Sequence, residues 1–543
     1  MTSHRLSALL GLLLSVCLRT GAHAGEASPV IITNDGPIRG SVAQGVASYL
    51  GIPYAKPPVG ALRWRAPQPP DAWRDVRNTV QFGPSCYQDP PAPIGPYGPE
   101  FLISLPMSED CLYLNVWTPV GRTEQLPVYV FIPGGAFLSG SGSVPIYDGT
   151  NLAAKGVVVV TMNYRLGVFG FLALPELASE SDIGSSGNYG LEDVIAALQW
   201  VNANIARFGG NPSVVTVGGQ SAGAMMVNDL LVSGPAKGLF ARAIAESGSG
   251  MGLPLMTLSE AEDWGMGFQK AAEVADVAQL RALSAAKLNQ VATAYQIARL
   301  DELTSGDVAA ARVLPFAPNI DGRFLGADPE GDTDPQSNVP LLTGFNSNEA
   351  SGAVGATPEE FIATVRTRYG AFADRFLALY PHATAQEATA SMAAMIRDRY
   401  MARLMFFSED RARASGEIVY DYLFDHAYPG SDPEKFGAFH TAEVPYVFGA
   451  LQQSGRVFTA ADHDVSRQLQ TYWIHFMKTG DPNDGDFSYW PKAGNSAALI
   501  MGLGDHPGAR LAVSSPARLA LFREYAARAD AHAVHALRRR DGS

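Results

Sequence analysis

The segment 214–223 constrains the fold of this 543-residue chain more than any other. It reads Val-Val-Thr-Val-Gly-Gly-Gln-Ser-Ala-Gly, a β-favouring run that leads directly into a G-x-S-x-G pentapeptide, and small apolar residues follow it. Gly219 and Gly223 stand two positions from the serine, because so sharp a turn between a strand and a helix leaves no space for side chains there. We therefore predict a strand, a tight turn and a helix, with the Ser221 hydroxyl exposed to a general base.

The flanks of this pentapeptide decide between a nucleophile and a structural serine, since G-x-S-x-G also occurs in ordinary turns. Here a strand-like run precedes the motif and a helix-compatible run follows it, which favours the nucleophile. The helix after Ser221 would also present free backbone N–H groups and the positive end of its dipole to developing negative charge.

The rest of the chain alternates predicted strands with predicted helices, which indicates an α/β fold with a mainly parallel sheet. Segments 128–132 and 157–162 are apolar apart from Thr161, as expected for strands that are covered on both faces. Shorter strands are predicted at 112–117, 243–245, 341–343 and 419–424. The Ala-rich segments 255–310 and 357–415 are predicted to be helical insertions without strands of their own, and residues 25–543 to form a single domain.

Residues 1–24 are predicted to be a secretory signal. Arg5 precedes an apolar run from Leu6 to Leu18, and Ala22-His23-Ala24 forms an A-x-A cleavage site. The run is too short to span a bilayer, so we expect cleavage after Ala24 and a secreted or periplasmic protein. No later segment has roughly 18 unbroken apolar residues, and we therefore expect no stable membrane insertion.

Charge and cysteine content limit the partners of the mature protein. Cleavage would remove Arg5 and Arg19 from the 40 basic residues, leaving 38 against 53 acidic residues and a net charge of −15. This balance argues against nucleic acid or an anionic membrane as a partner. The two remaining cysteines, Cys86 and Cys111, indicate one disulfide in an exported protein, because no further ligands stand at metal spacing. The oligomeric state stays open.

A serine nucleophile needs a general base, and the base needs an acid that orients it; on this fold they follow in the order Ser, acid, His. His440 lies in a loop with apolar neighbours downstream of the predicted strand 419–424, and Glu349 follows the predicted strand 341–343. His426 is the next candidate for the base. The other mature histidines stand in the tail, in a helical stretch or beside turn residues: His382, His463, His475, His506, His532 and His535. The residues alone leave both assignments open.

Several long motifs resemble the type-B carboxylesterases, the α/β-hydrolase family that includes cholinesterases and bacterial esterases. Two are intact, Phe208-Gly-Gly-Asn-Pro through Gly-Gln-Ser-Ala-Gly, and Glu109-Asp-Cys-Leu-Tyr-Leu-Asn-Val-Trp. Gly51-Ile-Pro-Tyr-Ala, Asn163-Tyr-Arg-Leu-Gly and Thr479-Gly-Asp-Pro-Asn also match, so the resemblance extends from about residue 30 to 491. It implies the α/β-hydrolase fold, with helical insertions around an active-site gorge.

The resemblance also implies the roles of individual residues. It places the nucleophile on Ser221, the acid on Glu349 and the base on His440. It implies an oxyanion hole from the backbone N–H groups of Gly135, Ala136 and Ala222, the Cys86–Cys111 disulfide, and the supporting residue Ser247 near the acid. Two structural ion pairs would be Arg63–Glu109 and Arg165–Asp193. No metal or organic cofactor is implied.

The chain departs from the common pattern of that family at four places. Ala136 replaces a third glycine, Gln220 replaces a glutamate before the nucleophile, and the acid stands in Asn348-Glu349-Ala350 rather than Asp-Glu-Gly. Phe101 stands where cholinesterases carry a choline-binding tryptophan. We therefore expect a serine ester hydrolase that forms an acyl-enzyme and prefers uncharged small-molecule esters with bulky alcohol parts. The alternatives are a non-catalytic adhesion or binding homologue, and an amidase or thioesterase of the same fold.

Overall fold

The computed structural model describes residues 26–540, except for 104–105, 307–313, 315, 332–334, 350–354 and 431. The predicted signal segment, residues 1–24, lies outside the described residues. Among the described residues, no helix has the length and apolar character needed to cross a membrane.

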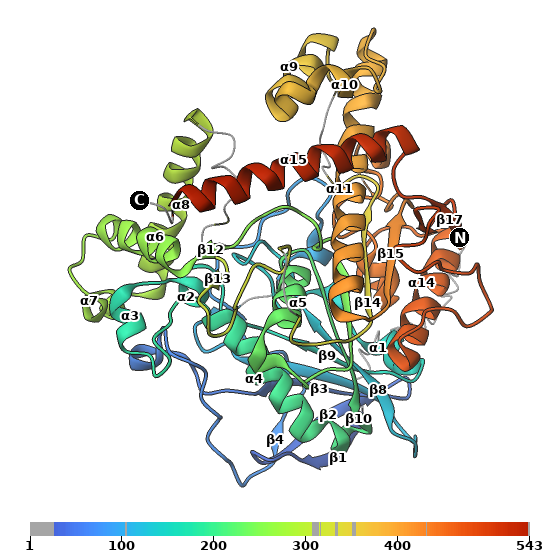
Figure 1. Cartoon of the computed structure of the whole chain (residues 1–543). Coiled ribbons are helices and arrows are strands. Elements are labelled where there is room, and N and C mark those ends of the chain that lie inside the picture. Colours follow the sequence, from blue (N-terminus) through green and yellow to red (C-terminus); the bar gives the residue numbers. More distant parts are fainter. Residues whose placement is uncertain are drawn as a thin grey trace, which may run out of the picture.

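A sheet of 13 strands forms the centre of the described structure, in the order β1-β2-β3-β7-β9-β8-β10-β11-β14-β15-β16-β17, with β4 beside β2 (Figure 1). From β9 to β16 in this order neighbouring strands run parallel, whereas β1, β2, β3, β7 and β17 pair antiparallel at the two ends. The strands are β1 (Glu26–Ile32), β2 (Pro37–Ala43), β3 (Val46–Pro53), β4 (Arg77–Asn78), β7 (Tyr113–Pro119), β8 (Leu126–Ile132), β9 (Val158–Met162), β10 (Gly210–Gln220), β11 (Arg242–Glu246), β14 (Leu341–Asn346), β15 (Val419–Phe424), β16 (Leu499–Leu503) and β17 (Gly508–Leu511).

Helices join and cover these strands. They are α1 (Thr150–Ala154), α2 (Gly167–Phe171), α3 (Pro175–Ser179), α4 (Tyr189–Asn204), α5 (Ala222–Val232), α6 (Leu258–Ala271), α7 (Val277–Ala282), α8 (Ala285–Gly306), α9 (Pro358–Tyr369), α10 (Ala373–Leu377), α11 (Ala385–Ser415), α12 (Pro433–Phe436), α13 (Val444–Phe448), α14 (Ala460–Thr479) and α15 (Pro516–Arg540). In Figure 1, α9 and α10 project beyond the body of the sheet, and α15 crosses above α11.

The predicted insertions are helical, but the expectation that they lack strands is wrong. Within 255–310 the segment β12 (Met256–Thr257) pairs in parallel with β13 (Asn319–Ile320). A further short pair joins β5 (Ser85–Cys86) to β6 (Met107–Ser108). Strands of two residues carry no periodicity, and Thr257 is also the N-cap of α6, so its local sequence indicates a helix start rather than a strand.

Alternation along β8 explains why both faces of the sheet are covered. Val128, Val130 and Ile132 join the core cluster that holds α4 and α5. Tyr129 and Phe131 point to the opposite face, into the cluster that holds α13 and α14. All of these side chains are fully buried. A strand buried on both faces must be apolar at every position, which is the pattern that the sequence shows.

The predicted turn between β10 and α5 is present, and close backbone contacts explain its glycines. A Cβ on Gly219 would lie 2.5 Å from the backbone carbon of Gly223, and one on Gly223 would lie 2.1 Å from the carbonyl oxygen of Ile132. Neither approach is possible for a larger residue. Ser221 between them adopts φ 58° and ψ −125°, outside the usual regions for a residue with a side chain.

Candidate functional site

The candidate site lies at the carboxyl ends of three parallel strands. Ser221 follows β10 directly, Glu349 stands three residues after β14, and His440 lies in the loop after β15. β14 and β15 are neighbours, and an isolated bridge between Asn348 and Phe439 joins their following loops. Residues far apart in the chain therefore meet because parallel strands end at one edge of the sheet.

Glu349 connects the two loops through its carboxylate. Its Oε1 accepts hydrogen bonds from the Ser247 hydroxyl at 2.6 Å and from the Asn346 backbone N–H at 2.7 Å. Its Oε2 pairs with Nδ1 of His440. The Glu349 side chain is 5% exposed and that of His440 is 22% exposed, so the pair is shielded while the ring remains reachable.

Glu349 controls the charge of the His440 ring. Burial lowers the pKa of His440, but the charge and hydrogen bond of Glu349, with a further contribution from the charge of Glu443, raise it above its ordinary value overall. The carboxylate next to Nδ1 favours the tautomer with a proton on Nδ1, which leaves Nε2 as the nitrogen that can accept a proton.

The structure does not join Ser221 to His440 by a hydrogen bond within the described residues. Nε2 of His440 lies 3.1 Å from Nε2 of Gln220, the residue before the serine. In the Nδ1–H tautomer, the Gln220 amide donates to this lone pair. Gln220 stood out in the sequence as a departure from the family pattern, but its contact with His440 could not be predicted, because the two residues are 220 positions apart in the chain.

The loop 133–140, which we call the oxyanion loop because it carries the first two predicted donors, passes next to Ser221: a Cβ on Gly134 would lie 3.0 Å from the Ser221 Cβ. Gly135 has φ 123° and Ala136 has φ 55°, so the backbone turns twice through left-handed conformations. Within the part of the chain that the structure describes, neither backbone N–H donates to a protein acceptor. Ala222 is the first residue of α5, and an N–H at that position has no partner within its own helix.

Two buried carboxyl groups beneath the site were missed by sequence reasoning. Glu443 accepts from Asn346 Nδ2 at 2.5 Å, and Glu246 accepts from Trp473 Nε1 at 2.8 Å. Burial and the charge of Glu349 raise the pKa of Glu443 to about 7, and burial with the charge of Glu443 raises that of Glu246. The only sign of Glu443 in the sequence was its position three residues after His440.

Among the described residues, no three His, Cys, Asp or Glu side chains are arranged to hold a metal ion.

His426, the other candidate base, lies in a separate ion cluster. Its Nδ1 is 2.6 Å from Asp505 Oδ1, and its Nε2 is 2.9 Å from Asp462 Oδ1. With a carboxylate on each nitrogen, the ring has no free lone pair for a substrate. Burial lowers the pKa of His426, but the hydrogen bonds and charges of both carboxylates raise it further than burial lowers it.

This cluster predicts a pH-dependent contribution to stability. Because the pKa of His426 is higher in the folded state than its unfolded value of about 6.5, the contribution is fully present below that value and is lost as pH rises through the folded pKa. We expect His426→Gln to have a lower free energy of unfolding than wild type in mildly acidic buffer. The difference between the two proteins should become smaller under alkaline conditions. Urea unfolding of both proteins across this range tests it, and a gap that widens with pH would contradict it.

The predicted disulfide and both predicted ion pairs are present. Cys86 is bonded to Cys111, and both cysteines are buried. Arg63 pairs with Glu109 at 2.5 Å and Arg165 with Asp193 at 2.7 Å. Asp193 lies in the first part of α4, so its pair with Arg165 joins the segment after β9 to the start of that helix.

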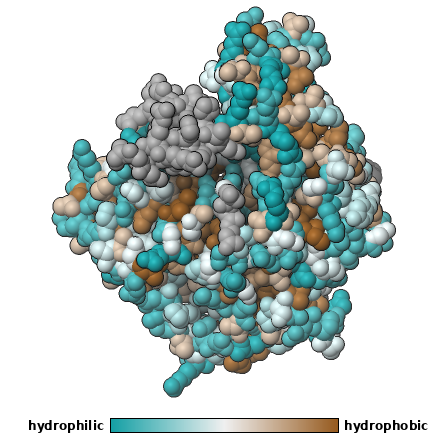
Figure 2. Space-filling view, viewed as in Figure 1, coloured by the Kyte–Doolittle hydropathy of each residue, from teal (hydrophilic) through white to brown (hydrophobic). Residues whose placement is uncertain are grey.

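A small apolar cavity lies beside α5, the helix that follows Ser221. Met225, whose backbone N–H bonds to the carbonyl of Ser221, forms part of its wall. The rest comes from the β12 and β13 segments: Leu253, Pro254, Leu255, Met256, Leu314, Ala317 and Pro318. Figure 2 shows hydrophobic residues gathered over this part of an otherwise mainly hydrophilic face. The cavity has a volume of about 10 Å³, which is room for a single water molecule, so it is a small gap beside α5 and not a binding site for a substrate group.

Comparisons with known proteins agree with this architecture. Residues 27–516 match the Carboxylesterase family. The chain is 37% identical to para-nitrobenzyl esterase of Bacillus subtilis over 489 residues, which cover 85% of this chain and 92% of that protein. It is 36% identical to fumonisin B1 esterase of Sphingopyxis macrogoltabida over 477 residues, which cover 85% of this chain and 84% of that protein. The solved structure of a thermophilic PNB esterase superposes with a TM-score of 0.75 at 34% identity, covering 91% of this chain and 99% of that one.

These matches span the sheet, the helical insertions and the loops that hold Ser221, Glu349 and His440. The resemblance noted in the sequence is thereby confirmed, as is the α/β-hydrolase fold. The chain belongs to the carboxylesterase family and is a carboxylic ester hydrolase.

Proposed function

We propose that the protein hydrolyses small-molecule esters through an acyl-enzyme, with Ser221 as nucleophile, His440 as general base and Glu349 as the acid that orients the base. The observation that carries this proposal is the Glu349–His440 pair at the strand ends beside the strained Ser221. A carboxylate on Nδ1 holds the ring in one orientation and stabilises the imidazolium that forms when Nε2 takes a proton.

In the proposed reaction, His440 takes the Ser221 proton as Ser221 Oγ attacks the ester carbonyl carbon. The tetrahedral intermediate collapses when His440 returns that proton to the leaving alcohol, and a water molecule then repeats both steps on the acyl-enzyme. The Gln220 amide must release Nε2 before the serine hydroxyl can use it. Hydrogen bonds of this kind are often loose before substrate binds and tighten in the complex.

Backbone N–H groups are proposed to stabilise the oxyanion of both intermediates. Gly135 and Ala136 supply two of them from the oxyanion loop, and Ala222 supplies the third at the N-terminus of α5. Donors fixed in place before the reaction are worth about 3–4 kcal/mol each in comparable enzymes. The helix dipole of α5 adds to the same effect.

The preferred substrates are proposed to be uncharged esters with bulky or aromatic alcohol parts. Gln220 is neutral where the family commonly has a carboxylate, and Phe101 is a weaker partner for a cation than tryptophan. Aromatic rings already surround Phe101, with centroids of Tyr97, Tyr428 and Phe439 at 5.6, 5.5 and 5.7 Å.

We expect acetylcholine to have no advantage in kcat/KM over its neutral isostere, in which carbon replaces the ammonium nitrogen. A fully buried acid such as Glu443 cannot contact the cation, and salt screens exposed charges beyond about 10 Å. Steady-state kinetics with both esters under the same conditions test this. A preference of tenfold or more for the cation, equivalent to about 1.4 kcal/mol, would contradict the proposed specificity while leaving the ester hydrolysis intact.

Export is the proposed localisation, supported by the signal-like residues 1–24 and by a disulfide that closes 25 residues of sequence. On the chain-entropy account, a loop of this size contributes about 3.5 kcal/mol to stability. We expect the exported protein to begin at Gly25 and to show no free thiol when it is denatured without reductant. Intact mass and thiol titration test this. Two titratable thiols per chain would contradict the disulfide and weaken the case for an oxidising compartment.

A further inference from the structure

We infer that the segment 86–101, which begins at the disulfide, positions the reacting groups on two sides of the site. Gln88 fixes the end of the oxyanion loop, and Tyr97 fixes the backbone of the base. We call residues 86–101 the clamp segment. This inference rests on the proposed triad and oxyanion hole, and it assigns to Gln88 and Tyr97 the role of positioning residues that touch no substrate.

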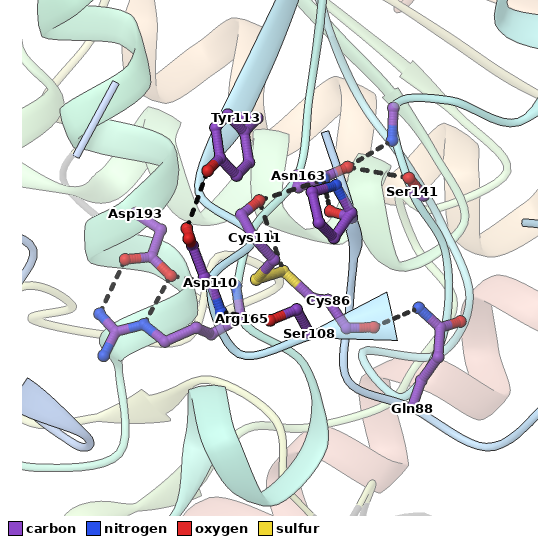
Figure 3. The surroundings of a disulfide bond; sticks show 12 residues. Cys86, Gln88, Ser108, Asp110, Cys111, Tyr113, Ser141, Asn163, Arg165 and Asp193 are labelled. Atoms are coloured by element: carbon purple, nitrogen blue, oxygen red, sulfur yellow. Dashed lines mark hydrogen bonds and ion pairs between the residues drawn. A yellow bond between two sulfur atoms is a disulfide. The ribbon is translucent and has the colours of Figure 1, made fainter. Parts of the chain in front are cut away.

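Gln88 holds Gly140, the last residue of the oxyanion loop, through both ends of its amide. Its Nε2 donates to the Gly140 carbonyl at 3.0 Å and to the Cys86 carbonyl at 2.9 Å, and its Oε1 accepts from the Gly140 N–H at 3.0 Å. Figure 3 shows Gln88 next to Cys86, one of the two cysteines of the disulfide. Gln88 is 2% exposed, so water does not replace these bonds readily.

Because Gly140 is fixed, the backbone that carries the predicted oxyanion donors is held in place as well. A Cβ at Gly140 would lie 2.3 Å from the carbonyl oxygen of Gly134, so the two backbones are in direct contact. The turn between them is closed by Ser139, whose N–H bonds to the Gly135 carbonyl at 3.0 Å. Movement of Gly140 would therefore shift the peptide groups of Gly134 and Gly135.

Tyr97 holds the other side of the site. Its hydroxyl donates to the backbone carbonyl of His440 at 2.9 Å, and its ring packs against Phe439 at 5.3 Å between centroids. From the opposite direction, Asn346 Nδ2 donates to the Phe439 carbonyl at 2.7 Å. The backbone of the base is thus held between the loop that carries the acid and the clamp segment.

The clamp segment is itself fixed at both ends. The disulfide holds Cys86, and Arg456 holds the other end by pairing with Glu100 Oε1 at 2.5 Å and donating to the Pro96 carbonyl at 2.7 Å. The Glu100 side chain is 4% exposed and that of Arg456 16%. A buried ion pair of this kind adds geometric specificity, because both charges must stay together once they are removed from water.

Positioning on this scale affects rate because the reaction depends on near-attack geometry. A displacement of about 1 Å can lower the rate by about 100-fold without altering the reacting groups. Gln88 and Tyr97 touch no substrate in this proposal, so ground-state binding of the substrate depends on other contacts. Loss of the clamp contacts should therefore lower kcat while KM changes little.

Gln88→Met and Tyr97→Phe test this, with Tyr113→Phe as the matched control. Tyr113 also loses a hydroxyl, which donates to Asp110 at 3.0 Å near the same disulfide but not to the site (Figure 3). Rates are expressed per active serine, counted by stoichiometric labelling with a fluorophosphonate, so that unfolded protein does not enter. Affinity for a neutral trifluoromethyl ketone, which forms an oxyanion adduct with the nucleophile, is measured on every variant.

We expect kcat to fall about 10- to 100-fold in Gln88→Met and about tenfold in Tyr97→Phe, with KM within about twofold and the control unchanged. Affinity for the ketone should fall in parallel with kcat/KM in Gln88→Met. If Gln88→Met yields no labelled protein, Tyr97→Phe alone tests the inference, because it removes a single oxygen atom and should still fold. Retained kcat, a change confined to KM, or an equal loss in Tyr113→Phe would overturn the inference. Failure of the proposed triad would instead appear as turnover by Ser221→Ala.

Discussion

Ser221→Ala is expected to lower kcat for ester hydrolysis by roughly 10⁵- to 10⁶-fold while the fold remains intact. Alanine removes only the hydroxyl. Within the described residues, the partly exposed serine side chain makes no hydrogen bond that supports the turn between β10 and α5. The backbone bond from the Ser221 N–H to the Glu246 carbonyl, 2.8 Å long, does not depend on the side chain. Steady-state kinetics with a chromogenic ester, together with thermal unfolding, measure both parts of the expectation.

The behaviour of His440 distinguishes a triad from an isolated serine. Because members of a triad act as a unit, His440→Ala should lose a similar factor, and the double variant with Ser221→Ala should fall hardly further. The kcat of Glu349→Gln should fall somewhat less, because the ring keeps a hydrogen-bond partner, although that partner is neutral and cannot stabilise the imidazolium by its charge. Replacement of His426 serves as the control and should leave kcat close to wild type. Near-wild-type turnover by His440→Ala would show that the base has been assigned to the wrong residue.

Asp193→Asn is expected to destabilise the protein by about 3–5 kcal/mol, the largest loss predicted for a residue away from the site. The side chains of Arg165 and Asp193 are 3% and 0% exposed. Asp193 Oδ2 accepts from the Arg165 backbone N–H at 3.0 Å and from its Nε at 2.8 Å, while Oδ1 accepts from Nη2 at 2.7 Å. An amide at this position leaves the buried guanidinium without the carboxylate that is hydrogen-bonded to it, and only the more distant charge of Glu192 remains.

Urea unfolding monitored by circular dichroism measures the free energy of unfolding of this variant. Glu124→Gln is the matched control, because its partner Arg122 and Glu124 itself are 48% and 54% exposed and such pairs contribute about 0–1 kcal/mol. We expect Glu124→Gln to unfold at the same urea concentration as wild type and Asp193→Asn to unfold at a clearly lower urea concentration. Equal stability of the two variants would show that the buried pair is not required for the fold.

The sequence predicted the elements whose signals are local. Segments 128–132 and 157–162 lie in β8 and β9, because a strand covered on both faces is apolar at nearly every position; the one polar residue, Thr161, donates its hydroxyl to the Gly142 carbonyl. The spacing of Gly219 and Gly223 around Ser221 predicted the turn, because the contacts that exclude a Cβ there lie within the turn or on the adjacent strand β8. The disulfide followed from composition, since export leaves only two cysteines to pair.

Only the tertiary structure decided which distant groups meet. From the residues alone His426 and His440 were both candidate bases, and the choice depends on the loops after β14 and β15 lying side by side, which brings Glu349 to one ring and not the other. The contact of Gln220 with His440, and the contacts of Gln88 and Tyr97 with two separate loops, likewise join residues from different parts of the chain. Local hydrophobicity and turn chemistry act over a few residues, whereas these contacts depend on sheet order and side-chain packing, which no short window of sequence contains.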